Sequence, residues 1–139
     1  MKVTLSDAAR RYIGLFDEVT DAGANDCLVE DDRLVVLVPA GEMGKAVGHG
    51  GRTVREFEER VGKTVELVED ADTAEAFVAN ALAPAAVRHV TISEQNDRVA
   101  YVEVAEDDRG VAIGKGGRNI DTARRLAERH YDIDDIQLT

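Results

Sequence analysis

Two short glycine-rich stretches have the residue types and the spacing of a loop that binds phosphate groups. They are Val47-Gly48-His49-Gly50-Gly51-Arg52-Thr53-Val54 and Ile113-Gly114-Lys115-Gly116-Gly117-Arg118-Asn119-Ile120. Each contains an aliphatic residue, a Gly-x-Gly-Gly tetrapeptide, an arginine, a residue that often caps helices and a second aliphatic residue. Gly114 lies 66 residues after Gly48 (114 − 48), about half of the 139-residue chain. This spacing indicates an internal repeat.

The tetrapeptides are suited to hold an anion at the start of a helix. Glycine has no Cβ, so its backbone can approach another polymer closely. Thr53 and Asn119 are favourable N-cap residues, and an amphipathic segment follows each of them. We therefore expect each tetrapeptide at a helix N-terminus, where free N–H groups and the helix dipole favour a phosphate. Further donors would come from the side chains of His49, Arg52, Lys115 and Arg118.

Spacing excludes two other phosphate-binding loops. A P-loop requires four residues between its first glycine and Gly-Lys-Ser/Thr. Only three residues separate Gly110 from Gly114, and Gly116 occupies the position of the hydroxyl residue. A dinucleotide-binding loop requires a third glycine three residues after the second, where this chain has Thr53 and Asn119.

The same order of elements is predicted around both tetrapeptides. Apolar periodicity and turn residues predict a helix, two strands in a hairpin, a short helix, the tetrapeptide, a longer helix and a last strand. In the first half these elements are residues 7–19, 27–30, 34–38, 42–47, 53–61 and 65–68. In the second half they are residues 73–82, 87–93, 99–104, 109–113, 119–131 and 133–138. We therefore predict an α+β fold with two small domains, residues 1–69 and 70–139.

This element order, with Gly-x-x-Gly between two helices, resembles the KH domain in its type II arrangement. Gly114-Lys115-Gly116-Gly117 fully matches the GxxG loop of that family, and Gly48-His49-Gly50-Gly51 matches it with His49 where a basic residue is more usual. The tandem pair resembles the archaeal NusA-like transcription termination/antitermination factors, especially in 112–120 and in Ile133-Asp134-Asp135-Ile136. The resemblance implies two type II KH domains, each a three-stranded sheet packed against three helices.

The resemblance also implies a ligand, because a KH loop clamps four nucleotides of a single strand. Phosphates would lie along 48–51 and 114–117, with Arg52 and Arg118 reaching a further phosphate. The bases would face a groove that is lined by Val47, Val54, Ile113 and Ile120. None of the six Phe and Tyr residues borders a glycine motif, which agrees with an aliphatic groove and not with a stacking platform.

The chain is strongly acidic, with a formal net charge of −11, which taken alone argues against nucleic acid. The basic residues, however, gather near the glycine motifs: five basic and three acidic residues lie in 45–63, and six basic and two acidic residues lie in 109–130. Only four of the 17 basic residues are lysine. An acidic surface poor in lysine is typical of proteins from salt-filled cytoplasms, and we adopt salt adaptation as a hypothesis.

Other kinds of site and location are not indicated. Cys27 is the single cysteine, so an internal disulfide is impossible, and Leu28 and Val29 beside it suggest a buried strand thiol. The three histidines lack ligand spacing, and no carboxylate is paired with an activating histidine or a nucleophile. We therefore predict no metal, no cofactor and no enzymatic activity. We expect a soluble, cytoplasmic monomer with neither a signal peptide nor a membrane segment.

Two functional interpretations remain. The first is a transcription termination/antitermination factor that binds single-stranded nascent RNA through both GxxG loops, near RNA polymerase. The alternative is a ribosome-associated or assembly factor that uses its KH domains mainly to dock proteins. Substitution of the GxxG residues would abolish partner binding in the first case only.

The salt hypothesis predicts that the protein loses its fold when salt is removed. In dilute buffer the repulsion between its carboxylates is unscreened. Circular dichroism during dialysis from molar KCl into dilute buffer would follow this loss. Full stability in dilute buffer would contradict the hypothesis.

Overall fold

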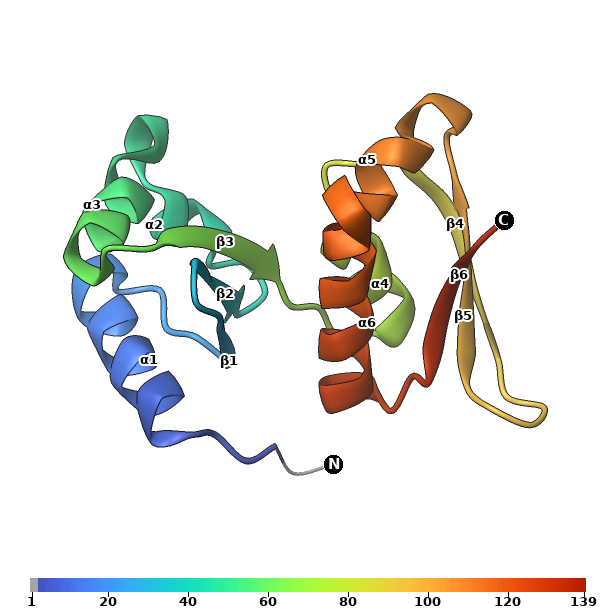
Figure 1. Cartoon of the computed structure of the whole chain (residues 1–139), viewed down its shortest axis with the longest axis horizontal. Helices are drawn as coiled ribbons and strands as arrows, with labels where there is room; N and C mark the ends of the chain where they lie inside the picture. The colour runs from blue at the N-terminus through green and yellow to red at the C-terminus, as the bar shows by residue number, and fades with distance from the viewer. Residues whose placement is uncertain (1–2) are drawn as a thin grey trace. The chain divides into compact units, whose positions relative to one another are not determined.

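The computed structural model describes residues 3–139 and contains two compact units. One unit comprises Thr4–Asp70, and the other contains Ala71–Thr139. Figure 1 shows that each unit has a sheet with its helices gathered along one face. No helix in the described part of the chain is long and apolar enough to cross a membrane.

The first unit has a three-stranded sheet in the order β1-β2-β3. Strands β1 and β2 form an antiparallel hairpin, whereas β2 and β3 are parallel. A parallel pair requires a crossover connection, and here two helices and the glycine motif supply it. The elements are α1 (Asp7–Thr20), β1 (Asp26–Val29), β2 (Arg33–Val38), α2 (Met43–Val47), the 3₁₀ turn η1 (His49–Gly51), α3 (Arg52–Val61) and β3 (Thr64–Glu69).

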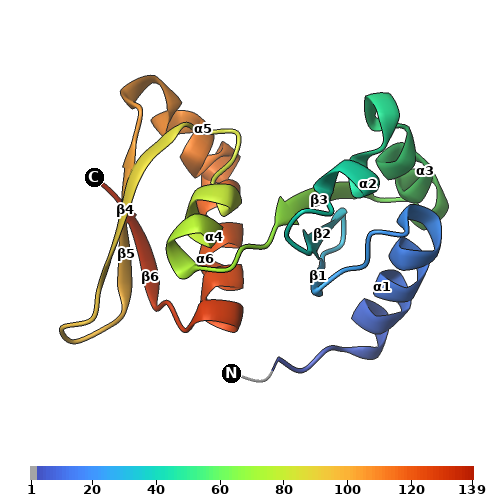
Figure 2. The ribbon, with the colours of Figure 1, turned by 180° about the vertical axis from the view of Figure 1, so that it is seen from behind.

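The second unit repeats this topology with the sheet order β4-β5-β6. Strands β4 and β5 are antiparallel, and β5 and β6 are parallel. Figure 2 shows the long β4–β5 hairpin from the opposite side. The elements are α4 (Ala74–Ala81), β4 (Val87–Ser93), β5 (Val99–Val104), η2 (Glu106–Asp108), α5 (Arg109–Ile113), η3 (Lys115–Gly117), α6 (Arg118–Tyr131) and β6 (Asp135–Leu138).

Aromatic residues hold the helices of each unit together. In the first unit, Phe16 of α1 and Phe57 of α3 are fully buried, and their rings meet edge to face at 5.0 Å. In the second unit, Phe77 of α4 stacks on Tyr131 of α6 at 4.7 Å. The Tyr131 hydroxyl donates to the Ala71 carbonyl at 2.6 Å, which satisfies its polar end. Each core therefore fixes the helix that follows its glycine motif.

The predicted α+β fold, with three strands and three α-helices in each half, is confirmed. The predicted bounds differ from the observed ones by at most two residues, and those of α5, β4 and β5 agree fully. The 3₁₀ turn η2 was not predicted, because Glu106-Asp107-Asp108 has no apolar periodicity.

Cys27 is a buried free thiol, as predicted from its apolar neighbours. It lies in β1, is 4% exposed and belongs to the core of the first unit. Burial, reinforced by the Asp26 carboxylate, raises the pKa of the thiol to about 12. The thiolate is the reactive form, so the thiol should be inert at neutral pH.

The thiol therefore provides a probe of the first unit. At pH 9 an exposed cysteine is mostly thiolate, whereas Cys27 with a pKa of about 12 is almost wholly protonated. Alkylation by iodoacetamide should be at least about 100-fold slower in the folded protein than in denaturant. Because the pKa is raised, its stabilising contribution is complete below about pH 9 and is lost toward pH 12. Equal alkylation rates would show that β1 is open.

Candidate nucleic-acid interface

Each glycine motif is a tight loop between two helices. In the first unit, the N–H groups of Gly48, Gly51 and Arg52 donate to the carbonyls of residues 44, 48 and 49, respectively. The second motif repeats these bonds from Gly114, Gly117 and Arg118. The bonds do not involve the N–H groups of the two central residues, which are 49 and 50 in the first loop and 115 and 116 in the second. All four central residues are exposed.

The first glycine of each motif is in close contact with the helix that follows. A Cβ on Gly48 would lie 2.1 Å from Thr53 Oγ1 and 2.8 Å from the Thr53 nitrogen. A Cβ on Gly114 would lie 2.7 Å from the Asn119 Cβ. By contrast, Gly50 and Gly116 have positive φ angles of 62° and 64° and open space around them. The first glycine is therefore required by packing and the second by backbone conformation alone.

The prediction that Thr53 and Asn119 are N-caps is wrong. Helix α3 begins at Arg52 with Gly51 in the cap position, and α6 begins at Arg118 with Gly117 there, without a side-chain cap in either case. The left-handed glycine reverses the chain two residues earlier than the capping preference suggests. Asn119 Nδ2 instead donates to the Ala112 carbonyl at 3.1 Å, so it satisfies the C-terminal end of α5. Asn119 thus ties together the two helices that flank the loop.

A surface groove of about 410 Å³ lies beside the second loop. Ile120 forms a buried floor, 5% exposed, and Ile113 forms an exposed edge, 40% exposed. Gly117 connects these apolar residues to the loop. On the opposite side the groove is bordered by Gln137 and Leu138 of the edge strand β6. The remaining lining residues are Arg109, Asp121 and Arg124.

The matching aliphatic residues of the first unit are less different in exposure than Ile113 and Ile120. Val47 and Val54 flank the first loop and are half-buried, whereas His49 and Arg52 are exposed. Lys115 and Arg118 are likewise exposed beside the second loop. Each loop therefore brings surface cations and aliphatic side chains together around its own glycines.

Comparison with known proteins reveals the family. A protein named "Probable transcription termination protein NusA" from Halococcus morrhuae is 63% identical over 138 residues, which is 99% of each chain. One of the same name from Halobacterium salinarum strain R1 is 60% identical over the full length of both chains. The chain belongs to the NusA family. Residues 74–139 match the family described as NusA-like second KH domain, and residues 10–74 match the KH domain.

A solved structure agrees with this assignment. The crystal structure of APE1850 has a TM-score of 0.84 and 33% identity, and the match covers 97% of this chain and 100% of that one. The two units are therefore tandem KH domains, as the sequence predicted. The groove beside Gly117 is a feature of the second of these domains.

Sequence reasoning missed Arg124, which lines the groove and anchors its edge strand. Its Nη2 donates to the Ile136 carbonyl at 2.9 Å, and its Nε lies 2.9 Å from Asp135 Oδ1. Its Nη1 pairs with Asp121 Oδ1 at 3.1 Å. In the first KH domain, Glu58 occupies the matching position and accepts a hydrogen bond from the Val65 N–H at 2.8 Å. The i,i+3 spacing indicated the ion pair of Asp121 and Arg124, but not the bond to Ile136.

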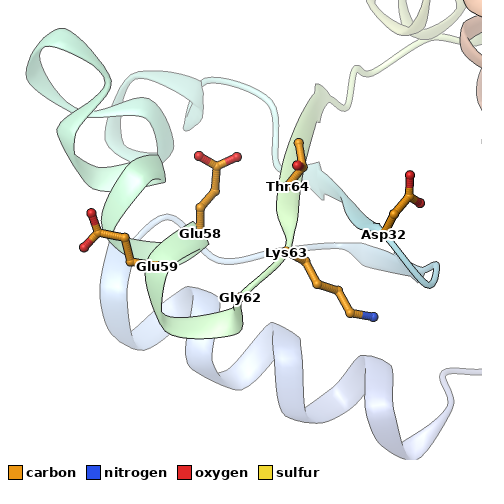
Figure 3. A pocket seen from close by; sticks show the side chains of 6 residues that line it. All are labelled: Asp32, Glu58, Glu59, Gly62, Lys63 and Thr64. Atoms are coloured by element: carbon orange, nitrogen blue, oxygen red, sulfur yellow. The ribbon is translucent and has the colours of Figure 1, made fainter.

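A second hollow, of about 400 Å³, lies at the far end of α3 in the first KH domain. Figure 3 shows Glu58 and Glu59 on the last turns of the helix, with Lys63 directed away from them. The Lys63 ammonium donates to the Glu30 carbonyl at 2.6 Å and lies over the Tyr12 ring. Because Asp32 also lines this hollow, its carboxylates would repel a phosphate chain.

The two kinds of glycine should respond differently to substitution. Gly114→Ala places a methyl group against Asn119 and should lower the free energy of unfolding by at least about 2 kcal/mol. Gly116→Ala meets open space and should cost only about 1 kcal/mol, from its left-handed backbone. Denaturant unfolding of both variants would measure the difference. Equal losses would contradict the packing role of the first glycine.

Proposed function

We propose that this protein binds single-stranded RNA through its two GxGG loops and acts in transcription termination or antitermination. The observation that carries the proposal is the repeated loop, with two exposed central residues whose N–H groups are not used by the hydrogen bonds of the loop, and an aliphatic groove beside the second copy. The names of the relatives, which include "Transcription termination/antitermination protein NusA" from Mycobacterium tuberculosis, support the process. That relative is 37% identical over 65% of this chain, and the match covers 26% of its own length.

The loop would hold the RNA backbone. The exposed residues Lys115 and Gly116 at the centre of the loop would offer their N–H groups, and the Lys115 ammonium adds a charge. Successive phosphates along the loop would use these donors and then Arg118. Residues 49, 50 and 52 would act in the same way in the first KH domain. The second and third glycines of the motif have no side chain, so the backbone of the RNA can come close to the loop.

The groove would hold the bases. It is lined by residues of α6 and of β6, among them the buried Ile120. No aromatic residue lines it, so bases would be held by apolar contact and by hydrogen bonds to groove edges. Unstacked bases of a single strand expose those edges, whereas a duplex hides them. The expected ligand is therefore nascent single-stranded RNA, with RNA polymerase as the nearby partner and no catalytic step.

The proposal predicts that a charge at the loop centre abolishes binding. Gly50→Asp and Gly116→Asp add a carboxylate at exposed positions with open space and a left-handed backbone, a conformation that Asp tolerates better than most residues. Each single variant should weaken binding to single-stranded RNA at least about tenfold, because the carboxylate repels the phosphate. The double variant should abolish binding. Fluorescence anisotropy in molar KCl would measure these affinities.

A matched control is available in the first KH domain. Gly62 has φ +69° and open space, and it lies at the opposite end of α3 in the acidic hollow of Figure 3. Gly62→Asp adds the same charge to a similar backbone and should leave RNA affinity unchanged. If the wild type does not bind RNA, or if the loop variants bind as well as it does, the proposal fails. Retained binding to a protein partner in the loop variants would then favour the docking alternative.

A further inference from the structure

The residue four positions after the last glycine of the motif differs in charge between the two KH domains. It is Arg55 in the first domain and Asp121 in the second. Both side chains lie against the loop. The Arg55 Nη1 atom would be 3.1 Å from a Cβ on Gly51, and the Asp121 Oδ2 atom would be 3.5 Å from a Cβ on Gly117. Equivalent positions beside the two loops therefore carry opposite charges.

The Asp121 carboxylate is held in place. Its Oδ1 atom accepts from Arg124, and Arg124 is fixed in turn by the Ile136 carbonyl. This leaves the Oδ2 atom, on the side of Gly117, at the edge of the groove that Asp121 lines. The Asp121 side chain is 67% exposed, so a ligand in the groove can reach it.

The Arg55 side chain, in contrast to Asp121, is not held by a neighbouring side chain. It makes no ion pair or hydrogen bond with any other residue of the described range 3–139, although it lies on the first turns of α3 beside Gly51. Its exposed guanidinium therefore keeps its donors available. The surface beside the first loop thus presents donors where the groove beside the second loop presents an acceptor.

A carboxylate beside a phosphate-binding loop repels the phosphates of the ligand. A favourable contact of Asp121 must therefore be with another part of the nucleotide. An ionised carboxylate only accepts hydrogen bonds. Adenine, cytosine and guanine offer exocyclic amino groups as donors, whereas uracil has no amino group and carries carbonyl oxygens. Uracil has a single N–H group on its base-pairing edge. The two carbonyl oxygens on either side of this group repel a carboxylate.

We propose that Asp121 and Arg55 select nucleobases and give the two loops different preferences. This inference rests on the proposed RNA binding. The second groove prefers adenine, cytosine and guanine to uracil, because Asp121 accepts from their amino groups. The surface beside the first loop prefers uracil, guanine and cytosine to adenine, because Arg55 donates to their carbonyl oxygens and adenine has none. A tandem site of this kind distinguishes RNA sequences even though both loops hold the backbone in the same way.

The test isolates the second groove in a Gly50→Asp background and measures affinity for short homopolymers of adenosine, cytidine and uridine. The adenosine and cytidine strands should bind at least about tenfold more tightly than the uridine strand. Asp121→Asn keeps an oxygen for Arg124 but presents an amide that both donates and accepts. It should bring the ratio of these affinities close to one.

Glu128→Gln is the matched control, since it removes the same charge from an exposed position on α6 outside the groove. It should leave the ratio unchanged. If Asp121 had only a structural role, its substitution would alter all three affinities together and leave their ratio unchanged. An unchanged ratio in Asp121→Asn would therefore overturn the inference, while the proposed RNA binding would stand. Absence of binding to all three strands by the wild type and by the Gly50→Asp protein overturns the proposed function itself, and the inference with it.

Discussion

The close contact between the first glycine of each motif and the following helix is the constraint on which the rest of the interface depends. Gly114 lies so near Asn119 that no side chain fits between them, and Gly48 is in the same relation to Thr53. This contact sets how closely the short helix approaches the long one. Buried Ala46 and Ala112 make the same approach possible from the short helix. With the two helices fixed, the two central residues of the loop between them are exposed.

In each domain a helix side chain also holds the edge strand of the sheet, but this side chain is acidic in the first domain and basic in the second. Val65 of β3 pairs with Leu34, and Ile136 of β6 pairs with Ala100, so the two residues occupy matching positions. Glu58 accepts a hydrogen bond from the Val65 N–H, whereas Arg124 donates one to the Ile136 carbonyl. Polar backbone groups at a sheet edge need partners, and either polarity supplies one. The fold is thus retained although the side chain that holds the edge strand is acidic in one domain and basic in the other.

The sequence predicted the elements well because their signals are local. Helix α6 and strands β4 and β5 have strong apolar periodicity, and the repeat allowed each half to support the other. The caps failed because Thr53 and Asn119 have good capping propensity, but the glycines before them adopt left-handed conformations that only the packed structure requires. The role of Arg124 was not predictable from spacing, since it depends on where β6 lies across the groove from α6.

Charge explains why contact-range hydrogen bonds matter in this protein. A net charge of −11 gives a long-range field that repels RNA in dilute solution. In molar salt the Debye length falls to about 3 Å, so that repulsion is screened, and so is the attraction of scattered cations. What remains is the interaction between groups in direct contact, such as the loop N–H donors with a phosphate or Asp121 with an amino group. Such contacts are directional, so an acidic protein that binds RNA under these conditions must gain both affinity and sequence preference from the shape of its loops and grooves.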